Sequence, residues 1–92
     1  MKRAVKLTIS GTVQGIFFRQ FCKETADKLG LKGFARNLKD GNLEIVIEGD
    51  GNSVEKMIEL CKKGPPHAQI RNVAAKEKNF SGEFNKFKIL RF

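Results

Sequence analysis

The 92-residue sequence has no tryptophan or tyrosine, one histidine and only two cysteines. Cys22 and Cys61 lack the C-x-x-C spacing and the nearby histidines of a metal site. Neither begins the C-x5-R loop of a cysteine-dependent phosphatase, because Lys28 and His67 occupy the sixth positions after them. His67 has no Ser/His/Asp arrangement or paired carboxylates around it. We therefore expect no metal, no cofactor and no protein nucleophile.

Long apolar runs are also absent, so no segment of the sequence could span a bilayer. The N-terminus begins with basic residues and then alternates instead of running apolar, which is unlike a signal peptide. A chain of this length has room for one hydrophobic core. We expect a single cytoplasmic domain over residues 1–92.

Acidic residues are scarce, because ten Asp and Glu against eighteen Lys and Arg give a formal net charge of +8. Such a charge concentrates anionic ligands around a protein. The lysines are dispersed along the chain and do not form a block, which is typical of a solvated basic surface. Charge alone is compatible with three alternatives: a phosphate-bearing substrate, an RNA ligand, or no specific anionic partner.

Hydrophobic periodicity predicts short strands alternating with two helices. Period-two patterns lie over 5–11, 32–39 and 43–48, with weaker strand signals over 70–75 and 84–90. Helical spacing covers 18–29, ended by Gly30, and a second helix from a cap at Asn52 or Ser53 to Gly64. Asp40 and Gly41 predict a tight hairpin.

This order of elements is the split β-α-β arrangement of an α+β, ferredoxin-like sandwich. We expect an antiparallel sheet of four to five strands with two helices on one face. The other face, which carries Lys6, Thr8 and Ser10 of the first strand and Glu44, Val46 and Glu48 of the third, is expected to remain in water.

The connection between the first strand and the first helix reads Gly11-Thr12-Val13-Gln14-Gly15-Ile16-Phe17-Phe18-Arg19. Its glycines permit a tight curl, whose backbone N–H groups would favour an anion together with the helix N-terminus. Arg19 gains nothing from the helix dipole in the first turn, whereas a guanidinium matches phosphate in a fork geometry. Spacing alone leaves a phosphate ligand and an ordinary surface arginine both open.

This connection resembles the acylphosphatase signature G-x-V-Q-G-x-x-F-R. The segment Gly33-Phe34-Ala35-Arg36-Asn37-Leu38-Lys39-Asp40-Gly41 is similar to that family's second motif, in which an asparagine precedes a hairpin turn. Gly64-Pro65-Pro66 and Phe87-Lys88-Ile89 also look like the family. The resemblance implies hydrolysis of the carboxyl-phosphate bond of acyl phosphates, with no metal.

The resemblance also implies roles for particular residues. Arg19 would bind and neutralise the phosphate, and Asn37 would orient the attacking water. The phosphoryl oxygens would be cradled by the backbone of Val13, Gln14, Gly15, Ile16, Phe17 and Phe18. An acyl phosphate is an activated substrate with a good leaving group. In-line attack by a positioned water, with substrate oxygens accepting its proton, is therefore sufficient. An asparagine near a hairpin often serves only the turn, which is the alternative for Asn37.

Two other functions compete with this interpretation. RNA-recognition modules share the fold class, and Lys32-Gly33-Phe34-Ala35 fits the first four positions of their octamer motif. The exposed faces of the first and third strands carry no ring for base stacking, so we expect no nucleic-acid partner. An acylphosphatase-like domain processing carbamoyl phosphate within a larger protein is the other alternative, and a free-standing enzyme is the simpler one.

The expected ligands are a small-molecule acyl phosphate and inorganic phosphate, the latter as product and competitor. No membrane partner is expected, and the polar sheet face favours a monomer. Because the two helices run antiparallel, Cys22 and Cys61 should lie at the same end of the sheet. A disulfide between them is conceivable, but free packed thiols are expected in a reducing cytoplasm.

Overall fold

The computed structural model describes residues 1–11, 16–66 and 68–90, residues 16 and 17 by their backbone only. The elements in chain order are β1 (Lys2–Gly11), α1 (Ile16–Leu29), β2 (Lys32–Asn37), β3 (Leu43–Asp50), α2 (Gly51–Lys63), β4 (Ile70–Lys78) and β5 (Phe87–Ile89). None of the described helices is long and apolar enough to cross a membrane.

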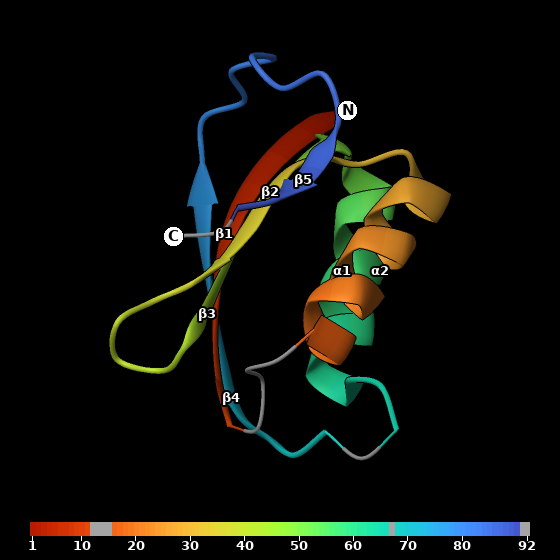
Figure 1. The fold of residues 1–92 in the computed structure, drawn as a ribbon. Helices are drawn as coiled ribbons and strands as arrows, with labels where there is room; N and C mark the ends of the chain where they lie inside the picture. Colours follow the sequence, from red (N-terminus) through yellow and green to blue (C-terminus); the bar gives the residue numbers. More distant parts are fainter. Residues whose placement is uncertain (12–15, 67, 91–92) are drawn as a thin grey trace.

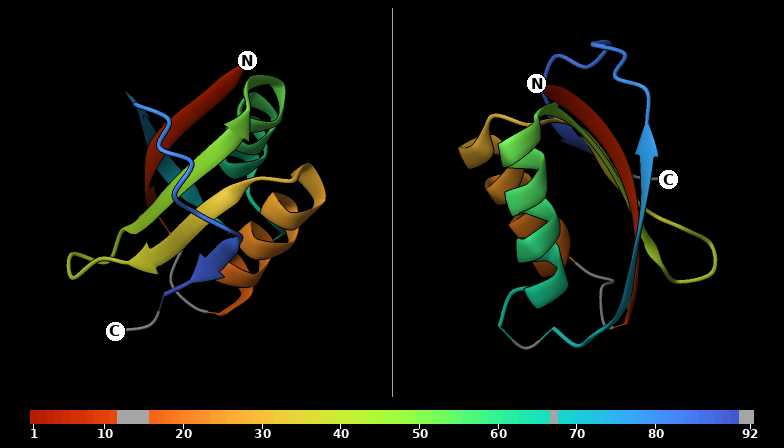
Figure 2. Two further views of the ribbon diagram at one scale, coloured as in Figure 1. Left: turned by 90° about the horizontal axis from the view of Figure 1, so that it is seen from above. Right: turned by 180° about the vertical axis from the view of Figure 1, so that it is seen from behind.

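The strands form one sheet in the order β4-β1-β3-β2-β5, and both helices cover the same face of it (Figures 1 and 2). The predicted ferredoxin-like α+β sandwich is confirmed. Its sheet is antiparallel except at one edge, where β5 runs parallel to β2. The difference arises because the chain leaves β4 at one edge and reverses direction before it reaches β5 at the other.

The core lies between the sheet and the helices, as the periodicity predicted. Leu7, Ile9 and Ile45 of the central strands are fully buried beneath the two helices. The helices contribute the stripes Phe18, Cys22, Ala26 and Val54, Met57, Ile58, Cys61. Burial of each large apolar side chain is worth roughly 1.5–3 kcal/mol, which makes this layer the main source of stability.

The C-terminal end of α1 agrees with the prediction, whereas the N-terminal cap of α2 differs from it. α1 ends where expected, with Gly30 at φ 70° and the Leu31 N–H donating to the Ala26 carbonyl at 2.9 Å. The cap of α2 was predicted at Asn52 or Ser53, which is wrong. The last residue of β3, Asp50, is the cap, and its Oδ2 accepts from the backbone N–H of Asn52 at 3.1 Å. Because β3 passes directly into α2, the capping side chain comes from the strand.

The predicted hairpin between β2 and β3 is confirmed, but β2 ends at Asn37, before the predicted residue 39. Leu38 N–H donates to the Asn42 carbonyl at 2.8 Å, and Gly41 N–H donates to the Leu38 carbonyl at 3.1 Å. Asp40 accepts from the backbone and the side-chain amide of Asn42 at 3.0 and 3.3 Å. These bonds close the turn without using the side chain of Asn37.

The outer face of β3 is covered, contrary to the expectation that it would remain in water. Glu44, Val46 and Glu48 are only 9%, 9% and 5% exposed. The connection over residues 79–86 crosses this face beside Glu48 on its way to β5, whereas Glu44 lies between the side chains of Lys6 and Arg36. The connection includes Phe84, which was predicted in the last strand and instead packs its ring edge to face against Phe34, at 5.9 Å between centroids.

Candidate functional site

One row of cross-strand neighbours defines the end of the sheet at which the two sequence motifs meet. Ile9 of β1 pairs with Leu43 of β3, which pairs in turn with Asn37 of β2. Directly opposed residues project from the same face, and adjacent strands lie about 4.8 Å apart. Asn37 therefore projects on the helix-covered face, about 10 Å from Ile9 across two strand spacings. It lies at the exposed margin of that face.

The start of α1 lies at the same end of the molecule. Four residues separate Gly11 of β1 from Ile16 of α1, which limits the span between them to about 18 Å. Phe18 anchors the first turn, because it is 3% exposed and its ring centroid lies 5.8 Å from that of Phe21. Arg19 follows in the same turn and is half-buried. α1 contacts both β2 and β5, and the left view of Figure 2 shows it beside these strands.

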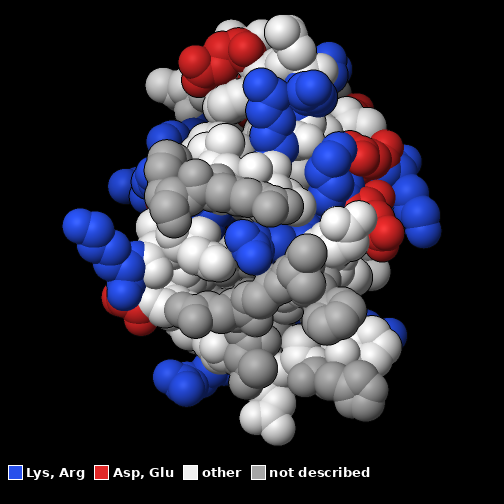
Figure 3. Space-filling view, viewed as in Figure 1, with Lys and Arg blue, Asp and Glu red and all other residues white. Residues whose placement is uncertain are grey.

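The first turn of α1 has the electrostatics of an anion site. No acidic residue lies in that turn, and the only charged side chain there is Arg19. A helix N-terminus carries a partial positive charge, so the two contributions have the same sign. Lys and Arg side chains are spread over several separate places on the face in Figure 3, as the dispersed lysines predicted.

Gly11 is both the last residue of β1 and the first residue of the first motif. A β-carbon on Gly11, whose φ is 128°, would lie 2.1 Å from the carbonyl oxygen of Gln69 and 2.8 Å from the backbone nitrogen of Arg71. The register of β1 against β4 also shifts between Ser10 and Gly11. The backbone at the beginning of β4 thus packs closely against Gly11, directly before the predicted phosphate loop. Sequence reasoning missed this contact, because no pattern within either segment reveals which strands are neighbours.

Asn37 is exposed, and its side-chain amide forms no hydrogen bond to any residue in the described ranges. The turn beside it is closed by Leu38, Asp40, Gly41 and Asn42 alone. The alternative that Asn37 serves only the turn therefore has no support. Its amide is available to a ligand or a water molecule.

Some predicted site residues lie outside the described residues, namely Val13, Gln14 and Gly15. Ile16 and Phe17 form the first two positions of α1. Over residues 1–11, 16–66 and 68–90, no three His, Cys, Asp or Glu side chains gather so as to hold a metal ion. Both cysteines are free and fully buried, so neither thiol reaches the site as a nucleophile.

Comparisons with known proteins agree with this geometry. The family model described as Acylphosphatase matches residues 5–89. A protein named Acylphosphatase from Syntrophobacter fumaroxidans is 44% identical over 88 residues, which are 96% of this chain and 91% of that protein. The crystal structure of acylphosphatase from Bacillus subtilis matches with a TM-score of 0.91 at 31% identity, over 99% of this chain and 100% of that one.

A larger protein also contains a region of this kind. The crystal structure of full-length HypF in the phosphate- and nucleotide-bound form matches 99% of this chain but only 12% of its own, with a TM-score of 0.85 and 31% identity. Both sequence motifs, the fold and the match over nearly the whole length lead to one conclusion. The chain belongs to the acylphosphatase family.

Proposed function

We propose that this protein hydrolyses the carboxyl-phosphate bond of acyl phosphates, releasing a carboxylate and inorganic phosphate. The observation that carries the proposal is the position of Asn37. It projects on the helix-covered face, at the end of the sheet from which β1 leads toward Arg19, and its amide is not needed by the turn. This position supports the proposal, because it would bring a water-orienting group and an anion site to one end of the molecule.

The phosphate would be held by Arg19 and by the backbone of residues 13–18. A first helical turn that has no acid and carries an arginine favours a bound anion, because a cation at a helix N-terminus is otherwise unfavourable. A guanidinium binds two phosphoryl oxygens at once. Both groups would stabilise the charge on the transferred phosphoryl group, which is the main task in phosphoryl transfer.

Asn37 would hold a water molecule in line with the bond that breaks. The water oxygen forms a bond to phosphorus, the bond between phosphorus and the bridging oxygen breaks, and the carboxylate leaves with that electron pair. The water proton passes to a phosphoryl oxygen, so no protein base is required. A carboxylate is a good leaving group, and positioning supplies the remainder of the catalysis.

Recognition through the phosphate alone would leave the acyl group largely unselected, and inorganic phosphate would compete with substrate. We propose further that residues 1–92 act as one domain and as a monomer. The two adjacent unpaired thiols support a reducing compartment such as the cytoplasm.

The experiment compares hydrolysis of benzoyl phosphate, carbamoyl phosphate and the monoester p-nitrophenyl phosphate. We expect cleavage of the acyl phosphate, inhibition by inorganic phosphate and no measurable cleavage of the monoester. Arg19→Ala and Asn37→Ala should each lower kcat/KM by at least about a hundredfold, the usual effect of losing a transition-state contact. Preference for carbamoyl phosphate would favour the alternative substrate.

Two control variants match these changes in chemistry. Arg3 lies at the opposite end of β1 and forms exposed ion pairs with Glu55 and Glu77. Asn72 is an exposed strand asparagine that pairs with Ser10 of the outer face. Arg3→Ala and Asn72→Ala should retain full activity. Cleavage of the monoester alone, or wild-type rates in folded Arg19→Ala and Asn37→Ala proteins, would refute the proposal.

A further inference from the structure

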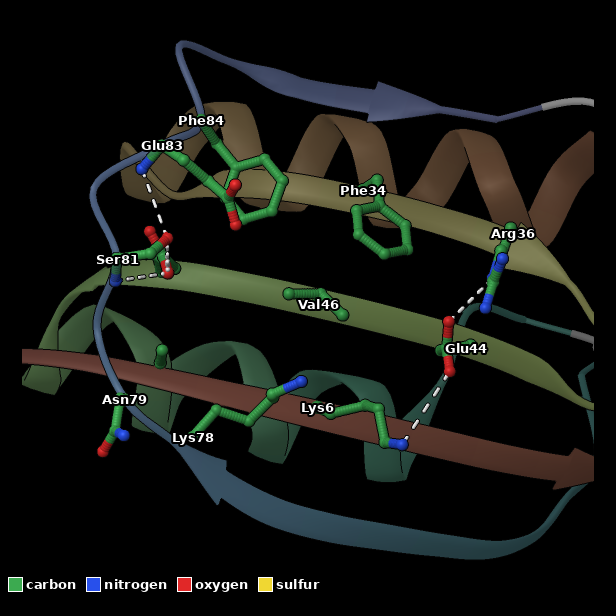
Figure 4. Close-up of a pocket in the computed structure, with 12 residues that line it drawn as sticks. Lys6, Phe34, Arg36, Glu44, Val46, Lys78, Asn79, Ser81, Glu83 and Phe84 are labelled. Atoms are coloured by element: carbon green, nitrogen blue, oxygen red, sulfur yellow. Dashed lines mark hydrogen bonds and ion pairs between the residues drawn. The ribbon is translucent and has the colours of Figure 1, made fainter.

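The outer face of the sheet, opposite the helices, contains a groove that the proposed reaction does not use. The groove has a volume of about 370 Å³, within the size range of small-ligand sites. Ala4 and Val46 form an apolar floor, and the two are 1% and 9% exposed. Figure 4 shows Phe34 and Phe84 on one side of Val46 and Lys6 and Lys78 on the other.

The aromatic side of the groove is held in place by contacts within the protein. Phe34 comes from β2, and Phe84 comes from the 79–86 connection, with their rings at an interplanar angle of 61°. The connection is fastened by Glu48, which accepts from Ser81 N, Ser81 Oγ and Gly82 N at 2.9, 2.8 and 3.0 Å. A preformed wall reduces the entropy that a ligand loses on binding.

The acids buried in the groove already have partners. Glu44 accepts from Arg36 Nε at 2.7 Å, and that guanidinium also lies 5.9 Å from the centre of the Phe34 ring. The Glu48 carboxylate accepts its hydrogen bonds from Ser81 and Gly82 of the 79–86 connection. The remaining acid that lines the groove is Glu83, an exposed side chain of the 79–86 connection.

The cations on the opposite side are less well compensated. Lys6 Nζ lies 4.0 Å from the Glu44 carboxylate, the limit for an ion pair, and that carboxylate is already bound by Arg36. Lys78 forms no ion pair with any residue that the structure describes. Lys6 and Lys78 thus lie across the apolar floor from the two aromatic rings, with the Lys6 ammonium group turned toward Glu44 (Figure 4).

We propose that this groove binds a planar aromatic or heteroaromatic compound that carries one anionic group. The ring would lie over Val46 against Phe34 and Phe84, where offset or edge-to-face packing is favourable. The anionic group would reach the ammonium groups of Lys6 and Lys78. A single negative charge fits best, because Glu83 at the rim opposes a polyanion. The site is separate from the catalytic end of the sheet and does not depend on the proposed reaction.

The test is a titration of the full chain with 2-naphthoate and, in parallel, with cyclic AMP, each of which carries one negative charge. Amide chemical shifts monitor both titrations, and fluorescence also monitors that of 2-naphthoate. We expect saturable binding of at least one probe, with shifts centred on Phe34, Val46 and Phe84. Excess inorganic phosphate should leave 2-naphthoate bound, whereas occupancy of the catalytic end would be reversed by it. The two probes distinguish an aromatic carboxylate from a nucleotide.

Three variants make the result specific. Lys78→Glu replaces an attraction by a repulsion at an exposed residue and should raise Kd about tenfold or more, which corresponds to about 1.4 kcal/mol. Phe84→Ala should weaken binding to a similar extent. Lys56→Glu makes the same charge change on an exposed position of α2, on the other side of the sheet, and should leave Kd within about twofold of wild type.

Equal affinities of wild type and Lys78→Glu would overturn the proposal, and so would shifts confined to the region of Arg19 and Asn37. Absence of saturable binding by both probes would do the same. Tighter binding of a short single-stranded oligonucleotide at the same residues would replace this proposal by a nucleic-acid site. The Lys78→Glu protein is expected to fold normally, because the side chain is exposed.

Discussion

The α-carbon of Gly11 lies so close to the Gln69 carbonyl that a β-carbon would come within 2.1 Å of the oxygen. The obstacle is backbone on both sides, so no side-chain rotation can relieve it. Because Gly11 precedes the predicted phosphate loop, this contact links the start of β4 to the geometry of the site.

Gly11→Ala should therefore lower both stability and activity. The substitution combines an unfavourable φ with a backbone clash, and we expect a loss of more than about 2 kcal/mol in urea unfolding. Gly30→Ala is the matched control, because Gly30 also has a positive φ but a β-carbon there would meet nothing within 4 Å. It should cost only about 1 kcal/mol and retain activity. Equal losses in the two variants would contradict the clash.

Asn37 and Asp40 should separate activity from stability. Asn37→Ala removes an exposed amide that the turn does not use, so the free energy of unfolding should change by less than about 0.5 kcal/mol while activity is lost. Asp40→Ala removes the acceptor for Asn42, which should cost about 1 kcal/mol and spare activity. Urea unfolding and initial rates on the same samples measure both quantities, and the opposite pattern would assign Asn37 to the turn.

Glu48 should stabilise the connection over 79–86. Its buried carboxylate accepts three hydrogen bonds, so Glu48→Ala should cost about 2–3 kcal/mol. Amide exchange of Ser81 and Gly82 should rise in parallel. Glu83→Ala, which changes an exposed acid of the same connection, is the control and should have little effect on either measurement. Unchanged exchange in Glu48→Ala would show that other contacts hold the connection.

The cysteines should be unreactive in the folded protein. A hydrogen bond with Cys61 and burial both raise the pKa of the Cys22 thiol, so little thiolate is available to react. We expect no labelling by a thiol reagent at neutral pH, two labelled thiols after unfolding, and identical gel migration with and without reductant. Faster migration of the unreduced sample would instead indicate a disulfide between α1 and α2.

The same pKa shift makes stability depend on pH at alkaline values. The folded state holds the Cys22 proton more tightly than the unfolded chain, whose thiol has its ordinary pKa of 9.0. The stabilisation is therefore complete below pH 9 and decreases as the pH rises above it. Cys22→Ala should show a smaller decrease in unfolding free energy between about pH 8 and 10 than wild type. Identical slopes would mean that other groups cause the alkaline loss.

The sequence predicted the parts of the fold that depend on local pattern. Alternation in β1 and β3 and the helical stripe through Met57 and Cys61 placed the core correctly, because side-chain period follows backbone geometry. The direction of β5 and the cover over Glu48 were not predictable in this way. Both depend on where the 79–86 connection travels, and its composition does not encode the strands that it crosses.

The candidate site shows the same division. The resemblance of the two motifs to the acylphosphatase family predicted Arg19 and Asn37 as site residues, and strand pairing then placed Asn37 on the helix-covered face. The contact of Gly11 with the start of β4 joins residues almost sixty positions apart, and no local pattern in the sequence specifies it.

The position of β1 inside the sheet, between β4 and β3, has a consequence for how quickly the native state forms. β1 pairs with β3 on one side and with β4 on the other, so its second neighbour begins at residue 70. Pairing of strands that are consecutive in sequence does not complete the sheet. β1 gains its second partner only when the long chain segment between β1 and β4 closes into a loop. Because such long-range closure loses entropy before it is repaid by contacts, refolding should take on the order of milliseconds to seconds, although both helices can form in microseconds.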